Sequence, residues 1–130
     1  MADETILPGE LISEYCGEIL TAGQARLREE FYMKSPEHDG NSYLIFNKGN
    51  AVDAQIFGNA SRYANHSCSP NSAFGIMWKS GATELQKNRV GIFCKKPIMR
   101  GEEITINYGD GKAESEIPCH CGSEVCLKFL

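Results

Sequence analysis

The sequence has no long apolar run and no excess of positive charge. None of its 130 residues lies in a stretch approaching the ~20 apolar residues of a membrane-spanning helix. The N-terminus is acidic and lacks the basic and then apolar pattern of a signal peptide, so we expect a reducing, intracellular compartment. Lys and Arg total 13 against 17 Asp and Glu, a net charge of −4. This balance disfavours direct nucleic-acid binding as the main task, and it suits a basic partner.

Glycine and proline are well represented, with 13 and 5 copies, which favours short strands and turns over a helical bundle. Thr21 and Gln24 have the spacing of a capping box and predict a helix over 22–33. Leu27 and Phe31 are expected on its inner face. Strands are expected over 10–15, 43–46, 51–53, 73–79, 89–95 and 103–108. The predicted fold is mostly β with one or two short helices.

Ten residues, 62–71, hold an unusual set of side chains. Asn65 and His66 place an amide beside an imidazole, and Cys68 is a candidate thiolate ligand. Pro70 and Asn71 disfavour regular structure, so we expect an ordered loop and neither a helix nor a strand. Taken alone, these residues fit a polar turn with an incidental cysteine equally well, because short motifs often occur by chance.

Three cysteines, Cys119, Cys121 and Cys126, stand within eight residues near the end of the sequence. In a reducing compartment such a cluster is more typical of metal ligands than of disulfides. Three thiolates are one ligand short of a closed tetrahedral zinc site. His120 lies between two of the cysteines, but its neighbours are expected to hold it outward.

The order of several motifs resembles one family. Asn-His-Ser-Cys-x-Pro-Asn over 65–71, Gly-Glu-Glu-Ile-Thr-Ile-Asn-Tyr over 101–108 and the final Cys-x-Cys-x4-Cys resemble a SET-domain lysine methyltransferase with its post-SET zinc segment. Residues 12–19 and 52–54 resemble the same family in the expected order. The resemblance implies a SET domain over 1–109 and a linker with a post-SET segment over 110–130. It also implies several small sheets, with the last strand threaded through a loop.

The resemblance supplies a fourth metal ligand, Cys68 of the central loop. A zinc ion shared by Cys68 and the three later cysteines would hold the C-terminal segment against that loop. Cys16 and Cys94 are the competing candidates, but both lie in strand-like apolar runs, where a buried free thiol is common.

Aromatic residues suit the substrate side of a lysine methyltransferase. A narrow, poorly hydrated channel favours the neutral amine, and tyrosine hydroxyls can orient it. By resemblance, Tyr108 is the catalytic tyrosine, Tyr15 lines the lysine channel and Tyr43 is a third, weaker candidate. Ile106 occupies a position that is usually aromatic in the family and tunes how many methyl groups fit. Because isoleucine has no hydroxyl, we expect higher methylation states to be possible.

Asn65 and His66 match the cofactor-binding pair of the family, and Arg62 stands where a basic residue often lies near the same ligand. The resemblance therefore implies S-adenosylmethionine as the methyl donor. The Gly-x-Gly turn that usually approaches the methionine end of this cofactor is not found before residue 12. We therefore expect a SET domain without that segment.

The predicted function is methyl transfer from S-adenosylmethionine to a lysine of a histone tail, in the nucleus and on chromatin. The predicted partners are a histone tail peptide and chromatin-complex subunits. A non-catalytic SET module that acts as a chromatin-associated binding or scaffold domain is the alternative, and a small zinc-ribbon-like adaptor is a third interpretation. Residues 118–130 look like the trithorax-type branch and residues 12–19 like the Polycomb branch, so the target lysine stays open.

Overall fold

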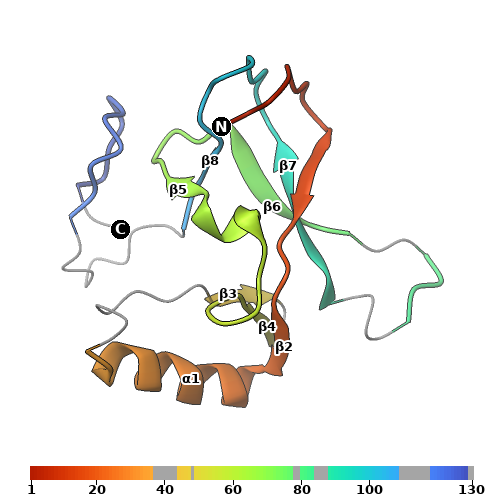
Figure 1. Cartoon of the computed structure of the whole chain (residues 1–130), viewed down its shortest axis with the longest axis vertical. Coiled ribbons are helices and arrows are strands. Elements are labelled where there is room, and N and C mark those ends of the chain that lie inside the picture. Colours follow the sequence, from red (N-terminus) through yellow and green to blue (C-terminus); the bar gives the residue numbers. More distant parts are fainter. Residues whose placement is uncertain (37–43, 48, 78–79, 84–87, 109–117, 129–130) are drawn as a thin grey trace. The chain divides into compact units, whose positions relative to one another are not determined.

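The computed structural model describes residues 1–36, 44–47, 49–77, 80–83, 88–108 and 118–128. In chain order the elements are β1 (Leu11–Glu14), β2 (Glu18–Thr21), α1 (Ala22–Lys34), β3 (Leu44–Asn47), β4 (Asn50–Asp53), the 3-10 helix η1 (Ala60–Tyr63), β5 (Asn65–His66), β6 (Ser72–Ile76), β7 (Val90–Cys94) and β8 (Thr105–Ile106). The strands form three small sheets, with the orders β1-β7-β6, β2-β4-β3 and β5-β8 (Figure 1). The prediction of a mostly β fold with one or two short helices is confirmed. No α-helix in the described part of the chain is long and apolar enough to cross a membrane.

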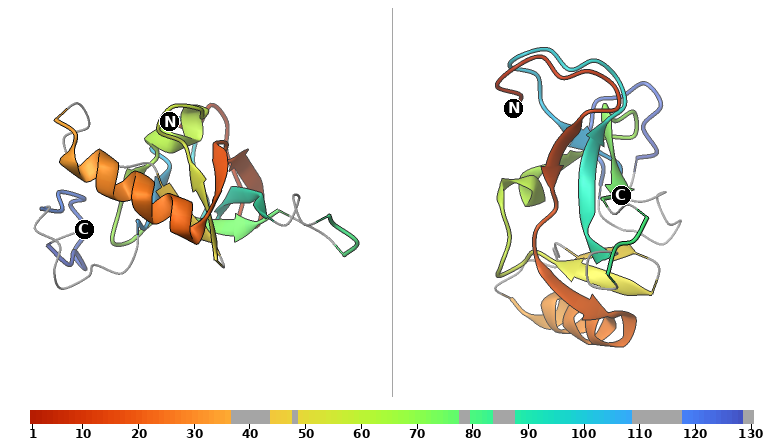
Figure 2. Two further views of the ribbon diagram at one scale, coloured as in Figure 1. Left: turned by 90° about the horizontal axis from the view of Figure 1, so that it is seen from below. Right: turned by 90° about the vertical axis from the view of Figure 1, so that its right-hand side faces the viewer.

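The chain divides into two compact units, and the second consists of Glu14–Arg62 and Ile76–Gly91. Its sheet is antiparallel, with β4 in the centre, so that Val52 pairs with both Ile19 and Ile45. Helix α1 contacts all three strands of this sheet and lies beside them (Figure 1), and Figure 2 shows the same elements from two other sides. The sheet and helix enclose a small core of Leu20, Ala25 and Ala51, with Leu44 packed against it.

The start of α1 is fixed by its first turn. The backbone N–H of Gln24 donates to Thr21 Oγ1 at 3.3 Å, and the backbone N–H of Thr21 donates to Gln24 Oε1 at 3.0 Å. This reciprocal pair is the predicted capping box, which satisfies two N–H groups that the helix itself leaves without acceptors.

The predicted inner face of α1 is wrong. Leu27 and Phe31 are 70% and 62% exposed, whereas Ala25 and Tyr32 are buried. The small side chain of Ala25 allows the helix to lie close to the sheet, and the Tyr32 hydroxyl donates a hydrogen bond to Asp53 of β4. The spacing of large apolar residues therefore indicated the wrong side of this helix.

Asp53, at the end of β4, is the buried polar partner of α1. Its carboxylate accepts hydrogen bonds from the Tyr32 hydroxyl at 2.7 Å, from Arg28 Nη1 at 2.9 Å and from the backbone N–H of Gln55 at 2.9 Å. Arg28 also pairs with Glu18 of β2 at 2.8 Å. A buried carboxylate is stable only when its oxygens are paired in this way. The network therefore fixes α1 against β2 and β4.

Replacing Tyr32 with phenylalanine removes the hydroxyl and leaves the Asp53 carboxylate with fewer donors. We expect Tyr32→Phe to lower the free energy of unfolding by about 1.5–3 kcal/mol, the usual worth of a hydrogen bond to a charged group. Urea denaturation followed by circular dichroism measures this. Tyr63→Phe, at a position 62% exposed, is the matched control. A loss no larger than that of the control would contradict the role given to this network.

The first unit consists of Met1–Ser13, Tyr63–Gly75 and Ile92–Leu130. Its buried core joins the N-terminus to the segment after β7, where Ile6 and Ile98 exchange backbone hydrogen bonds of 2.8 and 2.9 Å. The buried core residues are Ala2, Cys94 and Ile98. The partly buried residues that pack against them are Ile6, Ile12 and Ile104.

The segment over 62–71 lies beside β8, the last strand of the chain order given above. Residues 65 and 66 form β5, which pairs in parallel with β8, so the prediction of a loop without strand structure is wrong for these two residues. Asn71 holds the same two segments together, because its amide donates to the Glu103 carbonyl at 2.8 Å and accepts from the Thr105 N–H at 2.9 Å. Strand β8 is shorter than the predicted strand over 103–108. The threading of this strand through a loop stays a prediction.

Candidate functional site

Four cysteine thiols of the first unit converge. The Sγ atoms all lie within 4.8 Å of one another, and those of Cys68 and Cys119 are 3.9 Å apart. A tetrahedral zinc site with Zn–S bonds of about 2.3 Å places its sulfurs about 3.8 Å apart. The four members are Cys68, Cys119, Cys121 and Cys126. These are the four cysteines predicted as metal ligands, and the fold brings them together.

The two competing cysteines are used differently. Cys94 is buried, and its thiol donates to the Lys96 carbonyl at 2.9 Å. Cys16 belongs to the second unit and is half-buried, and the burial raises the pKa of its thiol. Among the described residues, neither is part of the cluster.

Backbone N–H groups point at the clustered sulfurs. Leu127 N–H donates to Cys68 Sγ at 3.4 Å, and Lys128 N–H donates to Cys126 Sγ at 3.4 Å. Such donors stabilise negative charge on sulfur and orient metal ligands. The donors and the sulfur spacing both fit a zinc ion bound by four thiolates.

The pKa values of two thiols in the cluster, those of Cys121 and Cys119, also fit a site for a metal cation. The backbone N–H groups of Cys68 and Ser123 lower the pKa of Cys121 to about 6. For Cys119 the backbone N–H of Cys121 also lowers the pKa, but desolvation and the neighbouring thiols outweigh it and raise that pKa to about 12. The thiolate form of Cys121 is therefore favoured at neutral pH, and ionisation of Cys119 needs a compensating cation.

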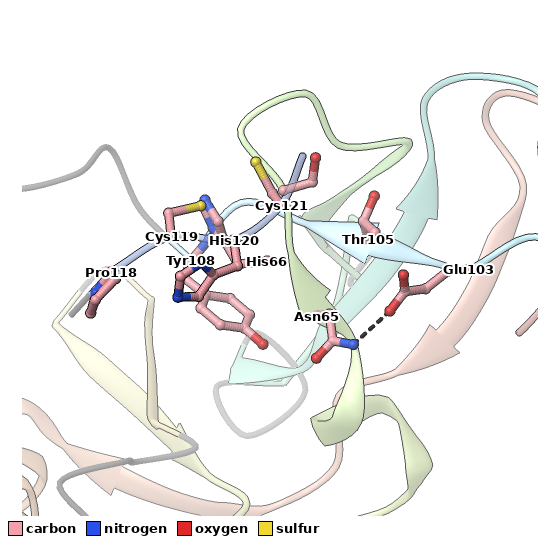
Figure 3. A pocket seen from close by; sticks show the side chains of 10 residues that line it. Asn65, His66, Glu103, Thr105, Tyr108, Pro118, Cys119, His120 and Cys121 are labelled. Carbon is pink, nitrogen blue, oxygen red and sulfur yellow. Dashed lines mark hydrogen bonds between the residues drawn. The ribbon is translucent and has the colours of Figure 1, made fainter. Parts of the chain in front are cut away.

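A pocket of about 330 Å³ lies beside the cluster (Figure 3). Small-molecule sites typically have volumes of roughly 300–1,000 Å³. The Asn65 side chain, a predicted cofactor ligand, donates a hydrogen bond to Glu103 Oε1 at one side of this pocket (Figure 3). The lining residues are Asn65, His66, Ser67, Glu103, Thr105, Tyr108, Pro118, Cys119, His120 and Cys121.

Tyr108 is held against residues 64–66 at three points. Its hydroxyl donates to the Ala64 carbonyl at 2.7 Å, its backbone N–H donates to His66 Nδ1 at 3.1 Å, and its ring centroid lies 5.3 Å from that of His66. The side chain is still 52% exposed. Tyr108 is therefore held in place and is also accessible to solvent.

The imidazole of His66 is contacted on both nitrogens, since its Nε2 lies 3.3 Å from Cys68 Sγ. Desolvation lowers the pKa of this half-buried histidine, so its neutral form is favoured at neutral pH. The ring therefore sits between the pocket tyrosine and one member of the cysteine cluster.

A comparison with protein families decides the identity of this fold. The model of the SET domain matches residues 1–109. This chain belongs to the SET-domain family. The match includes β5, β8 and Tyr108, and it agrees with the small sheets described above.

Curated relatives align along nearly the whole SET-domain chain. A histone-lysine N-methyltransferase specific for H3 lysine-36 from Aspergillus oryzae is 36% identical over 133 residues, covering 99% of this chain and 13% of that protein. A fission yeast (Schizosaccharomyces pombe) enzyme of the same specificity is 34% identical, covering 99% of this chain and 16% of that protein. An H3 lysine-4 specific enzyme from Schizosaccharomyces pombe is 36% identical, covering 99% of this chain and 13% of that protein. The chain thus spans only about a seventh of the length of these relatives.

The other predicted residues of the SET domain fall in different places. Ile106 is only 2% exposed and lies in β8. Tyr15 and Arg62 belong to the second unit, where Tyr15 is buried and Arg62 Nη1 donates to the Ala54 carbonyl at 3.0 Å. Tyr43 lies outside the described residues. The catalytic and cofactor-binding roles given to these residues stay predictions.

The sequence-based predictions missed Glu103 and Thr105. Both line the pocket, Glu103 binds Asn65, and Thr105 pairs with Asn65 between β8 and β5. The available signal was their place in the Gly-Glu-Glu-Ile-Thr motif, which directly precedes Tyr108. His120 also lines the pocket and is not part of the cysteine cluster.

Proposed function

We propose that this chain is the catalytic domain of a histone-lysine N-methyltransferase, which transfers a methyl group from S-adenosylmethionine to a lysine of a histone tail. Its SET-domain membership and the names of its relatives support this proposal. The observation that carries it is the pocket, in which Asn65, Tyr108 and the segment around Cys119 meet. Such an enzyme acts in the nucleus on chromatin, and further subunits of a chromatin complex are expected partners.

Tyr108 has the geometry of a residue that orients the lysine amine. Free lysine has a pKa near ~10.4, so the amine must lose its proton before it can act as a nucleophile. The Tyr108 hydroxyl donates its hydrogen to the Ala64 carbonyl, so its oxygen faces a substrate as an acceptor. An acceptor at a fixed position can direct the lone pair of a neutral amine.

The pocket residues fit a sulfonium cofactor. S-adenosylmethionine supplies the methyl group when it is bound. The Tyr108 ring and the Glu103 carboxylate suit a cation, and the Asn65 amide and Thr105 hydroxyl offer hydrogen bonds to polar groups. Backbone groups of His66 would add contacts, because both ring nitrogens of that residue are already engaged within the protein.

The four clustered cysteines would hold a structural zinc ion. Four thiolates form a closed site with no open position for a substrate, so the ion would serve the fold and not the chemical step. Since Cys119 and Cys121 also line the pocket, zinc binding would fix one of its walls.

Methyl transfer to histone H3 peptides tests the proposed function. The zinc-loaded chain is incubated with labelled S-adenosylmethionine and with peptides that contain H3 lysine-4 or H3 lysine-36, the two sites named for the relatives. We expect transfer to at least one peptide and none to a matched peptide with arginine at that position. No transfer to these peptides or to whole H3, by a folded chain that binds zinc, would favour the non-catalytic module instead.

The product state depends on the space around the reacting amine. Ile106 is buried and has no hydroxyl to hold a water beside the amine. We therefore expect di- or trimethylated peptide when the cofactor is in excess, measured by intact mass. Ile106→Val is the matched variant and should keep this product range. A monomethyl product alone would contradict the role given to Ile106.

A further inference from the structure

His66 joins two parts of the first unit that the proposed chemistry treats separately. One side of its ring meets the backbone of Tyr108, with 3.1 Å between the Tyr108 nitrogen and His66 Nδ1. The other nitrogen, Nε2, lies 3.3 Å from Cys68 Sγ. One imidazole therefore contacts both the pocket tyrosine and a member of the cysteine cluster.

The contact with Tyr108 fixes the tautomer of the ring. A backbone N–H can only donate, so His66 Nδ1 is the acceptor and carries no hydrogen. In a neutral imidazole the hydrogen then lies on Nε2. The Nε2–H group consequently donates to the Cys68 sulfur, next to the Leu127 N–H that reaches the same atom at 3.4 Å.

The strength of the N–H···S bond depends on the charge of the sulfur. A thiolate is a stronger acceptor than a thiol, because hydrogen bonds to ionised acceptors are about twice as strong as neutral ones. Cys68 carries a thiolate when it binds a metal ion. Metal binding would therefore strengthen the hydrogen bond from His66 Nε2–H to Cys68 Sγ. A more ordered His66 ring would in turn fix the position of the Tyr108 backbone N–H that donates to it.

We propose that His66 is a positioning residue that couples occupancy of the cysteine cluster to the placement of Tyr108. The proposal rests on the zinc site of the proposed function, but it requires no contact between the imidazole and the cofactor. The Ala64 carbonyl holds the Tyr108 hydroxyl, whereas the His66 ring holds the main chain of this tyrosine. Loss of zinc would then loosen the tyrosine as well as the C-terminal segment.

Two variants separate the two contacts of the ring. His66→Asn places an acceptor near the position of Nδ1 but has no donor at Nε2. His66→Gln places a donor near the position of Nε2 but has no acceptor at Nδ1. Zinc affinity is measured by competition with a chromophoric chelator, and hydrogen exchange of the Tyr108 amide is measured by NMR with and without zinc. Neither measurement uses S-adenosylmethionine or a peptide, so failure here is separate from failure of methyl transfer.

In the unchanged chain we expect zinc to slow exchange of the Tyr108 amide about tenfold. His66→Asn should bind zinc about 10–100-fold more weakly, the usual effect of losing a partner of a metal ligand, and its Tyr108 amide should no longer respond to zinc. His66→Gln should bind zinc within about threefold of the unchanged chain, while its Tyr108 amide exchanges fast in both states. Equal zinc affinity in all three chains, or an unaltered response of Tyr108 to zinc in His66→Asn, would overturn the proposal.

A measurement on the unchanged chain guards against misfolded variants. Nitrogen-15 chemical shifts of His66 report which ring nitrogen carries the hydrogen. We expect a neutral ring with the hydrogen on Nε2, both before and after zinc is added. A hydrogen on Nδ1 would remove the acceptor for Tyr108 and would overturn the coupling, whatever the variants do.

Discussion

Replacing Tyr108 with phenylalanine is expected to lower kcat for methyl transfer to a histone peptide about 100-fold or more, since a misplaced reacting group can cost about 10²-fold in rate. The hydroxyl donates to the Ala64 carbonyl and presents its oxygen to the substrate, and phenylalanine removes both functions. The main-chain bond to His66 is kept, so the backbone should hold its place. Initial rates at saturating cofactor and peptide measure the effect.

The control for this substitution is Tyr63→Phe, which removes a hydroxyl from a neighbouring, 62% exposed tyrosine. We expect its kcat to stay within about twofold of the unchanged chain, as for most surface substitutions. Tyr108→Phe should also keep its zinc affinity and melt within a few degrees of the unchanged chain. A Tyr108→Phe chain that is folded and retains more than half of kcat would rule out a catalytic role for this hydroxyl.

Removing one thiol of the cysteine cluster is expected to lower the affinity of the chain for both zinc and S-adenosylmethionine. Cys126→Ser leaves three thiols for the ion, so zinc affinity should fall about 100-fold or more. Cys126 does not line the pocket, but Cys119 and Cys121 do, and they would share the ion with it. Without the ion that wall loses its fixed position, so affinity for S-adenosylmethionine should fall about tenfold or more. Calorimetric titration of each ligand measures the two effects.

Cys16→Ser provides the comparison, because Cys16 is half-buried, lies in the second unit and is not a member of the cluster. Its zinc and cofactor affinities should match those of the unchanged chain. If Cys126→Ser weakened zinc binding and left cofactor affinity unaltered, the C-terminal segment would not serve as a wall of the cofactor site.

Local patterns in the sequence predicted several parts of the fold. The capping box of Thr21 and Gln24 predicted the start of α1, and the strands expected over 73–79 and 89–95 correspond to β6 and β7. The side on which α1 is buried was not predictable in this way. Helix α1 packs through Ala25 and Tyr32, and the partner of the Tyr32 hydroxyl is an aspartate 21 positions away in the chain. The helical periodicity of a sequence reports the spacing of large apolar side chains. It contains no information on a hydrogen bond between Tyr32 and the distant Asp53.

The site shows the same division between local and distant information. The motif over 65–71 marked Asn65, His66 and Cys68 as a group, and the spacing of the later cysteines marked a metal cluster. The parallel pairing of β5 with β8 joins residues 40 positions apart in the sequence, and no local sequence pattern predicts it. The contacts of His66 with Tyr108 and of Asn65 with Glu103 follow from that pairing, so they became visible only in three dimensions.

Titration of the zinc-loaded chain with S-adenosylmethionine in a calorimeter tests the central claim most directly. If the pocket beside Tyr108 holds the cofactor, one molecule should bind per chain with a dissociation constant in the micromolar range, about −8 kcal/mol. Asn65→Ala should weaken that binding about tenfold, because it removes one pocket hydrogen-bonding group. A folded chain that carries one zinc ion and releases no heat of binding would contradict the assignment of this pocket as the cofactor site.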